Sequence, residues 1–264
     1  MNKRKSTAKN FFKFKQGTLY QGNYLSTLNH AVDVRLILTS PPYNIGSAGE
    51  RVDGLRKLGK YDLKSFSGIN SYSDNLPEDI YQNQQAEFLL WALTRVKPDG
   101  VIAYVHKNRH KKKKLISPYE WILPLVTANK IKIYEEIVWD RGSTHNHDKN
   151  YLYPESERIY ILCNPKARPF FKNFDPDGKH KGMSDVWQIS RARSSNHDAA
   201  FPVSLAERLI LCYSKPGEVV MDPYSGSGTC FLAAIKHKRK FIGSELSILH
   251  FENACKRIQT FLES

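Results

Sequence analysis

Strand-like and helix-like apolar patterns alternate through most of the chain, and this alternation constrains the fold more than any other feature. The expected strands cover residues 35–39, 101–105, 131–139, 157–163, 218–221 and 241–243, and the expected helices cover 77–96, 202–214, 229–237 and 247–262, with one more beginning at Ser117. A strand that is followed by a helix and another strand usually returns parallel to the first. The pattern therefore predicts an α/β fold with a doubly wound, mostly parallel sheet.

Composition agrees with a single domain over residues 1–264. Hydrophobic residues make up 41% of the chain and aromatic residues 12%, which is enough to build a core and excludes general disorder. No apolar run approaches the roughly 20 residues of a membrane-spanning helix, so we expect a cytoplasmic protein. The cysteines lack the spacing of a zinc site, and we expect reduced core residues at these positions: Cys163, Cys212, Cys230 and Cys255.

The net charge of +14 favours a polyanionic partner, with nucleic acid ahead of anionic lipid. Residues 1–16 form a basic arm, for which a solvated tail is an equally good interpretation. A second basic block directly follows the expected strand over 101–105, where open α/β sheets place their sites, so we expect it to contact phosphates. Its cationic residues are Lys107, Arg109, Lys111, Lys112, Lys113 and Lys114.

A glycine-rich turn between a strand and a helix is the first chemical motif. It runs through Asp222, Pro223, Tyr224, Ser225, Gly226, Ser227, Gly228 and Thr229. Glycines let the backbone approach a ligand, and the following helix offers free N–H groups. The lysine of a triphosphate-binding loop is absent after Gly228. Glu245 ends the next strand, where an acid accepts hydrogen bonds from ribose, although alone it could be a surface acid. A nucleoside such as S-adenosylmethionine (AdoMet) fits.

The second motif is Ser40-Pro41-Pro42-Tyr43, at the end of the strand over 35–39. Two prolines hold the backbone extended and remove two N–H donors, so the polar groups here are mostly acceptors. The Ser40 hydroxyl and the Pro41 carbonyl could accept both hydrogens of an exocyclic amine, while the Tyr43 ring could lie on the attached base. Taken alone, the motif fits equally well a proline-rich loop with a packing tyrosine.

The two motifs and their order resemble those of the β-class DNA amino-methyltransferases. A Lys-Pro-Asp-Gly turn over 97–100, Phe201-Pro202 with Glu207-Arg208-Leu209-Ile210, and Gly243-Ser244-Glu245 fall at matching places. The resemblance implies the Rossmann-like fold of AdoMet-dependent methyltransferases, with AdoMet as cofactor and double-stranded DNA as partner. The stretches 44–76 and 107–156 lie outside the cofactor motifs and are rich in Arg, Lys, Asn, Ser and Tyr, so we expect them to be DNA-binding, target-recognition insertions.

Site residues follow from the resemblance. It implies that residues 222–229 surround the methionine part of AdoMet and that Glu245 holds the ribose. The stretch 196–202 would complete the cofactor pocket. The remaining cofactor residues implied in this way are Asn23, Thr39, His197, Phe201 and Pro202. Many family members have Gly-Asp where this chain has Gly22-Asn23.

In the resembling family, Ser before Pro-Pro-Tyr is typical of cytosine-N4 enzymes, whereas Asp or Asn mostly marks adenine-N6 enzymes. Ser40 therefore favours methylation of a cytosine that is flipped out of the duplex, by direct transfer and without a metal. An adenine-N6 enzyme and a non-catalytic, basic nucleic-acid-binding protein remain alternatives. A bacterial restriction–modification system is the expected setting, with a cognate endonuclease and a homodimer as further partners to test.

Overall fold

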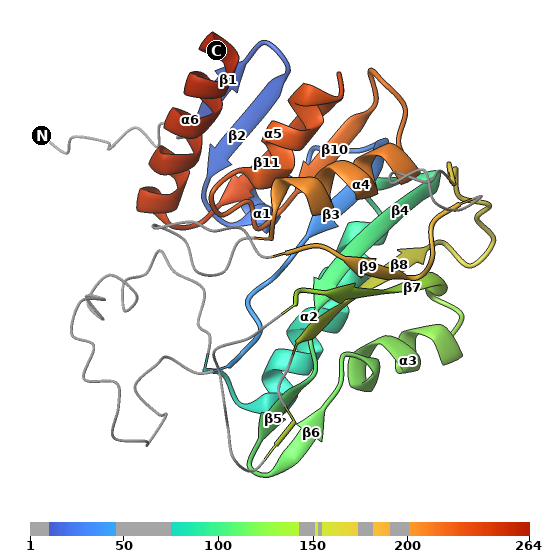
Figure 1. Ribbon diagram of the computed structural model, residues 1–264. Coiled ribbons are helices and arrows are strands. Elements are labelled where there is room, and N and C mark those ends of the chain that lie inside the picture. The colour runs from blue at the N-terminus through green and yellow to red at the C-terminus, as the bar shows by residue number, and fades with distance from the viewer. Residues whose placement is uncertain (1–10, 46–74, 143–150, 153–154, 174–181, 191–200) are drawn as a thin grey trace, which may run out of the picture.

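The computed structural model describes residues 11–45, 75–142, 151–152, 155–173, 182–190 and 201–264. One sheet is built from β1 (Phe11–Phe14), β2 (Gly17–Gln21), β3 (Val34–Thr39), β4 (Val96–His106), β7 (Lys132–Asp140), β8 (Ser156–Cys163), β9 (Val186–Gln188), β10 (Val219–Asp222) and β11 (Lys240–Glu245). Their order across the sheet is β1-β2-β11-β10-β3-β4-β8-β7-β9 (Figure 1). A separate hairpin pairs β5 (Arg109–Lys111) with β6 (Lys114–Ile116).

The central part of the sheet is parallel. β2, β11, β10, β3 and β4 pair side by side in the same direction, which confirms the doubly wound, mostly parallel sheet. β8 runs antiparallel to both β4 and β7, and β1 is antiparallel to β2. The carboxyl ends of β10, β3 and β4 therefore lie at one edge of the sheet, together with the amino end of β8.

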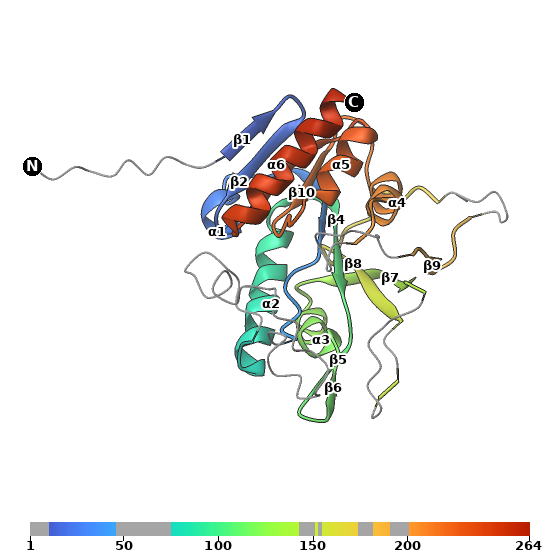
Figure 2. The same cartoon turned by 60° about the vertical axis from the view of Figure 1, so that its left-hand side comes forward.

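Helices cover both faces of the sheet (Figures 1 and 2). One layer contains α1 (Tyr24–Thr27), α2 (Glu78–Leu93) and α3 (Tyr119–Thr127), and the other contains α4 (Val203–Tyr213), α5 (Thr229–Lys236) and α6 (Ile248–Glu263). Among the described helices, none has the length and apolarity needed to cross a membrane.

Side-chain alternation in the central strands fills two cores. In β3, Leu36 and Leu38 pack on the α4–α5–α6 side, whereas Ile37 packs on the α1–α2–α3 side. In β4, Ala103 packs on the α4–α5–α6 side and Tyr104 on the α1–α2–α3 side. Because both faces are covered, residues 36–38 of β3 and 101–105 of β4 form runs without alternating polar positions, as expected for parallel strands. All four cysteines are buried free thiols, as the sequence predicts.

Two expected boundaries of the domain organisation differ from the structure. The basic arm does not extend over 1–16, because Phe11–Phe14 forms β1 and the Phe14 ring packs 5.6 Å from that of Phe241. Residues 107–156 are not one inserted loop, because α3 and β7 lie within them and bury Trp121 and Trp139 in the two cores.

The other expected insertion, 44–76, falls mostly on residues outside the described ones. Its two ends are joined: Oδ1 of Asn44 accepts a 2.6 Å hydrogen bond from the Leu76 backbone N–H, and its Nδ2 donates to the Leu76 carbonyl at 3.1 Å. Asn44, directly after the Ser-Pro-Pro-Tyr motif, is therefore held against the residues that precede α2.

Candidate functional site

The two sequence motifs meet at one edge of the sheet. β10 ends at Asp222, and its neighbour β3 ends at Thr39, directly before Ser40. The Thr39 hydroxyl donates a 2.8 Å hydrogen bond to Oδ1 of Asp222, and both side chains are buried. Thr39 therefore joins the glycine-rich turn to the Ser-Pro-Pro-Tyr turn, and its hydroxyl is engaged within the protein.

Asp222 has a buried carboxyl group with a raised pKa. It is 3% exposed, and it also accepts a hydrogen bond from the Tyr224 backbone N–H. Burial disfavours the charged form and raises the pKa of Asp222 from 3.8 to about 6, despite the hydrogen bonds that the carboxyl accepts. The group that links the two motifs therefore changes its charge close to neutral pH.

We expect Asp222→Asn to stabilise the folded chain at pH 8 by about 3 kcal/mol and to have little effect near pH 4. The raised pKa means that folding favours the protonated carboxyl. Its contribution to stability is complete below pH 3.8 and is lost as the pH rises through about 6. Urea unfolding of both proteins at several pH values measures the difference, and a difference that is independent of pH would contradict this prediction.

The glycine-rich turn has room for a ligand. Gly226 and Gly228 have positive φ angles of 49° and 79°, and a Cβ built on Gly226 would meet nothing within 4 Å. Beside this open space, the buried Ser225 hydroxyl has no hydrogen-bond partner among the described residues. A buried polar atom without a partner is costly, so a polar ligand at this turn would supply the missing contact.

Glu245 stands at the carboxyl end of β11, next to this turn. Its buried carboxylate accepts hydrogen bonds from the backbone N–H groups of Gly226 and Ser247, both at 2.8 Å. Burial raises the pKa of Glu245, and these backbone bonds oppose the shift. A carboxylate has about four acceptor sites, so capacity for ligand hydroxyls remains. The backbone N–H of Gly22 donates to the Glu245 carbonyl at 2.8 Å, which brings Asn23 beside the site.

Other predicted cofactor residues have structural roles of their own. Asn23 caps α1 by accepting a 2.9 Å hydrogen bond from the Leu25 N–H. The Tyr224 ring packs 5.3 Å from that of Tyr24. Phe201 is buried in the core just before α4, and Pro202, Pro223, Ser227 and Thr229 are also buried. His197 lies outside the described residues. A cofactor role for each of them stays a prediction.

The Ser-Pro-Pro-Tyr turn forms a hydrogen-bonded unit. The Ser40 hydroxyl lies 2.8 Å from the Tyr43 hydroxyl, which donates a 2.9 Å hydrogen bond to Oε2 of Glu157 at the start of β8. Burial, together with the Glu157 charge, raises the pKa of Tyr43 well above its usual value, so the hydroxyl stays neutral. One side of the Tyr43 ring packs against His106, with ring centroids 4.4 Å apart, and the Lys107 ammonium lies 5.5 Å from the ring centroid.

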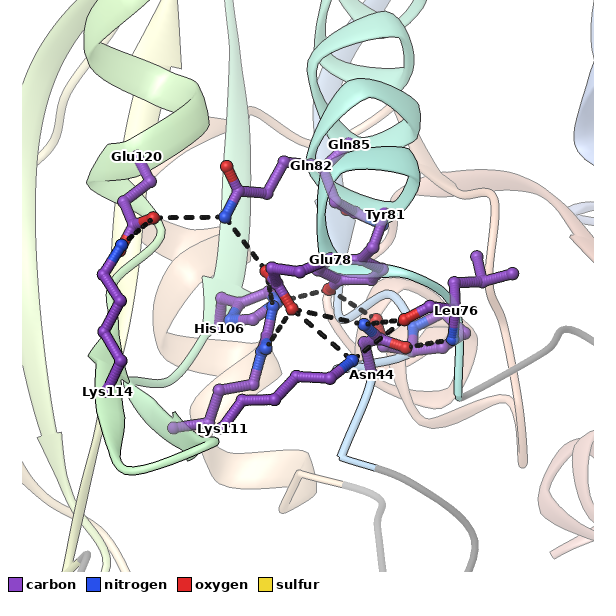
Figure 3. Close-up of polar contacts among 12 residues, drawn as sticks. Asn44, Leu76, Glu78, Tyr81, Gln82, Gln85, His106, Lys111, Lys114 and Glu120 are labelled. Carbon is purple, nitrogen blue, oxygen red and sulfur yellow. Dashed lines mark hydrogen bonds and ion pairs between the residues drawn. The ribbon is translucent and has the colours of Figure 1, made fainter.

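His106 orients the same turn through Tyr81 (Figure 3). Burial lowers the pKa of His106 to about 3, so the ring is neutral. Its Nδ1 lies 2.8 Å from the Lys107 backbone N and 2.9 Å from the Lys107 carbonyl, its Nε2 lies 2.7 Å from the Tyr81 hydroxyl, and that hydroxyl lies 2.7 Å from the Pro42 carbonyl. If Nε2 carries the proton, it donates to the Tyr81 oxygen, and Tyr81 donates its own hydrogen to the Pro42 carbonyl. If Nδ1 carried the proton, the single Tyr81 hydrogen would face two acceptors, Nε2 and the Pro42 carbonyl. The tautomer protonated on Nε2 gives each of these hydrogen bonds one donor and one acceptor, and it holds the Pro42 carbonyl in place. The Pro41 carbonyl lies outside this chain of bonds.

The predicted phosphate-binding block forms the β5–β6 hairpin, and Arg109 within it is turned inward. Arg109 is 6% exposed, and its guanidinium donates to both carboxylate oxygens of Glu78, at 2.8 and 2.6 Å. Lys111 donates to the Leu76 carbonyl, and Lys114 pairs with Glu120 at 3.2 Å. The tip residues Lys112 and Lys113 are exposed, with φ angles of 49° and 64°. Arg109 is thus an anchor of the hairpin, and the tip offers the accessible charge.

Tyr81, His106 and Glu157 are missing from the residues that the motifs predict. His106 and Glu157 lie at the ends of strands that the sequence does predict. This position at a strand end could have indicated that they belong to the site. Glu157 reaches the site because β8 is antiparallel to β4, and no local pattern encodes that direction. Tyr81 lies within the predicted helix over 77–96 and carries no separate signal.

A family model described as DNA methylase matches residues 34–256, from β3 into α6, and this span includes both motifs. The chain belongs to the DNA methylase family. The family methylates amino groups of DNA bases, adenine N6 or cytosine N4, so the expected resemblance to DNA amino-methyltransferases is confirmed. The chain is therefore a DNA methyltransferase, and DNA is its substrate.

Two curated relatives are similar to most of the chain. DNA adenine methyltransferase YhdJ of Escherichia coli is 27% identical over 266 residues, covering 91% of this chain and 82% of the relative. Type II methyltransferase M2.MboI of Moraxella bovis is 25% identical over 254 residues, covering 92% and 88%.

Solved methylase structures share the fold. The cytosine-N4-specific PvuII DNA methyltransferase has a TM-score of 0.73 at 18% identity and covers 96% of this chain, with 94% of its own chain matched. A DNA modification methylase of Thermus thermophilus, TTHA0409, in complex with S-adenosyl-L-methionine, has a TM-score of 0.65 at 20% identity, covering 92% and 93%. These likenesses confirm the fold expected of AdoMet-dependent methyltransferases.

Proposed function

We propose that this DNA methylase transfers a methyl group from AdoMet to the exocyclic N4 amine of a flipped cytosine in duplex DNA. The observation that carries the proposal is the Ser40 hydroxyl at the carboxyl end of β3, one residue from the Thr39–Asp222 link to the glycine-rich turn. In the wider family, Ser at this position accompanies cytosine-N4 activity.

The described residues fit AdoMet as the cofactor. The unpartnered Ser225 hydroxyl and the open space at Gly226 suit its methionine part, and the Glu245 carboxylate suits the ribose hydroxyls. Asn23 would contact the adenine, which is supported by the backbone bond between Gly22 and Glu245 beside it. Bound there, AdoMet supplies a sulfonium methyl group, and the chain has to aim the amine at it.

The orientation of the Ser40 hydroxyl follows from the bonds around it. Tyr43 has one hydroxyl hydrogen, which it donates to Glu157, so Ser40 must donate its own hydrogen to the Tyr43 oxygen. The lone pairs of Ser40 then face the amine and accept one N–H, while the Pro41 carbonyl accepts the other. Two such bonds favour a pyramidal nitrogen whose lone pair points at the methyl group, and positioning of this kind accelerates a direct displacement.

An adenine-N6 activity is the second candidate, favoured by the 27% identity to an enzyme named DNA adenine methyltransferase. Incubation of mixed-sequence DNA with labelled AdoMet, followed by digestion and chromatography of nucleosides, separates the two. N4-methylcytosine is the expected product. N6-methyladenine would replace the cytosine assignment, and unlabelled nucleosides would contradict DNA methylation itself.

A restriction–modification role is proposed from relatives named type II methyltransferases, such as M2.MboI. One relative, M.BamHII of Bacillus amyloliquefaciens, 24% identical over 270 residues, is named an orphan methyltransferase, so a cognate endonuclease does not accompany every member. Purification of a nuclease that the chain's own methylation blocks would support the restriction–modification role. A homodimer stays a prediction that light scattering tests.

The exposed tip of the β5–β6 hairpin is the DNA contact that we propose from the basic block. Lys112 and Lys113 form its two-residue turn, with Lys111 and Lys114 paired across it. Both turn residues have positive φ angles, which glycine and asparagine adopt far more readily than lysine. The two lysines therefore strain the backbone of the turn, and such strain is typical of residues that have a function.

We expect Lys112→Asn with Lys113→Gly to weaken DNA binding while leaving the fold as stable as before or slightly more so. Asn-Gly suits this turn better than Lys-Lys, so lower affinity could not be blamed on a damaged hairpin. Loss of two phosphate contacts reduces the slope of log K against log[salt] by about 2. Binding is measured by fluorescence anisotropy over a range of salt concentrations.

The matched control is Lys130→Asn with Lys166→Asn. Both lysines are exposed, and they flank the ends of β7 and β8 at the opposite edge of the sheet. An equal fall in slope for the control pair would mean that general charge, rather than the hairpin tip, sets the salt dependence.

A further inference from the structure

A buried chain of polar groups leads away from the proposed amine site. Ser40 contacts the Tyr43 hydroxyl at 2.8 Å, Tyr43 donates to Oε2 of Glu157 at 2.9 Å, and Oε1 of Glu157 accepts from the Arg141 guanidinium at 2.7 Å. Glu157 and Arg141 are each 8% exposed. The chain joins the end of β3 to the start of β8 and to the residue that follows β7.

The direction of these bonds makes the chain a path for a proton. Each hydroxyl donates toward Glu157, so a hydrogen that arrives at Ser40 can be passed on by exchange at two oxygens. Arg141 donates to the other carboxylate oxygen, so both oxygens of Glu157 are held in place by hydrogen bonds. The path therefore starts at the atom that would contact the amine and ends at a base.

A methylated amine must lose a proton. The nitrogen lone pair forms the bond to the methyl carbon, the carbon–sulfur bond breaks with its electron pair going to sulfur, and positive charge develops on the nitrogen. Breaking one N–H bond, with its electron pair kept on nitrogen, restores a neutral amine. Ser40 and the Pro41 carbonyl would contact these hydrogens, and Ser40 alone of the two can pass a proton on.

We propose that Glu157 accepts this proton through Tyr43 and Ser40, a step that rests on the proposed methyl transfer but is the same for cytosine and for adenine. As the methyl group is transferred, the amine proton moves to the Ser40 oxygen, the Ser40 hydrogen moves to Tyr43, and the Tyr43 hydrogen moves to Glu157. The sulfonium charge has disappeared and one carboxylate charge has been neutralised, so atoms and charge balance. Loss of the proton from Glu157 to solvent resets the path.

Other groups near Tyr43 do not serve as the acceptor. His106 packs on the Tyr43 ring, but its Nδ1 accepts from the Lys107 N–H and its Nε2 is directed at Tyr81. Its lowered pKa of about 3 makes it a poor base. Lys107 is a cation near the ring. Glu157 is the acid that both the geometry and the hydrogen-bond directions select.

The test replaces Glu157 by Gln, which keeps an acceptor for Tyr43 but removes the basic oxygen. Glu136→Gln is the matched control: Glu136 also accepts from a tyrosine hydroxyl, Tyr119 at 2.6 Å, and pairs with an arginine, Arg158 at 3.3 Å, but it lies outside the path. Single-turnover methylation rates are measured for full-length proteins at saturating AdoMet and DNA, in H₂O and in D₂O, together with AdoMet affinity and melting temperature.

For Glu157→Gln we expect a fall of about 100-fold in the single-turnover rate, as for loss of a general base, with AdoMet affinity within about twofold. We expect the unaltered enzyme to methylate more slowly in D₂O, with a rate that depends on the deuterium fraction in a curved way. In Glu157→Gln we expect this solvent isotope effect to be lost. Glu136→Gln should keep both the rate and the isotope effect. A Glu157→Gln rate within threefold of the unaltered rate would overturn the proposal, and so would a slow rate with an unchanged isotope effect, which indicates a structural role. No methylated product from the unaltered enzyme would refute the proposed function instead.

Discussion

Ser40→Ala is expected to lower the single-turnover methylation rate by about 100- to 1,000-fold while AdoMet binding changes by less than about twofold. The substitution removes the acceptor for one amine hydrogen and the first member of the path to Glu157. It leaves the Thr39–Asp222 bond and the glycine-rich turn intact, because neither involves the Ser40 side chain. Rates are measured with saturating labelled AdoMet and DNA, and cofactor affinity by calorimetry.

Thr127→Ala serves as the control for loss of a hydroxyl, since Thr127 is exposed at the end of α3 and should leave the rate unchanged. If Ser40→Ala methylated DNA at the unaltered rate, Ser40 would have no part in the transfer. A parallel loss of AdoMet affinity would instead make Ser40 a cofactor residue. Because Tyr43 keeps its bond to Glu157 in this variant, the two halves of the path can be separated experimentally.

The parallel part of the fold could be predicted from the sequence because its signals are local. β3 and β4 contain apolar runs over 36–38 and 101–105, and a turn or helix signal follows most of the predicted strands. β1 was not predicted because its phenylalanines lie among the lysines of a basic segment, and such a segment resembles a solvated arm. The antiparallel direction of β8 depends on pairing with distant strands, and no local pattern specifies it.

The site could be predicted in part for the same reason. Ser40, Asp222 and Glu245 directly end or follow strands, and the carboxyl ends of parallel strands share an edge. Arg109 was assigned to DNA because it stands among lysines, yet the partner that buries it, Glu78, is 31 residues away in sequence. Long-range pairs of this kind require the fold, since their effect depends on which elements pack together.

Glu78→Gln is expected to lower the free energy of unfolding by about 3 kcal/mol at pH 7, near the lower end for a broken buried ion pair because Glu78 remains partly exposed. Glu78 holds Arg109 with two hydrogen bonds and also contacts Gln82 at 3.0 Å (Figure 3). The neutral amide would leave the Arg109 charge buried without a counter-charge. Urea unfolding measures the loss, and Glu120→Gln, at the more exposed pair with Lys114, should cost less than about 1 kcal/mol.

The pH dependence identifies the ion pair as the cause of this loss. Burial opposes ionisation of Glu78, but the bonds from Arg109 and Gln82 outweigh it and hold its pKa below 4.5. The contribution of a carboxyl with a lowered pKa is present above 4.5 and disappears as the pH falls through the folded value, so the difference between Glu78→Gln and the unaltered chain should shrink in acid. Glu78→Leu with Arg109→Met should recover most of the stability, since apolar residues can replace a buried pair. If the double variant were less stable than Glu78→Gln, the side chains would matter through packing rather than through charge.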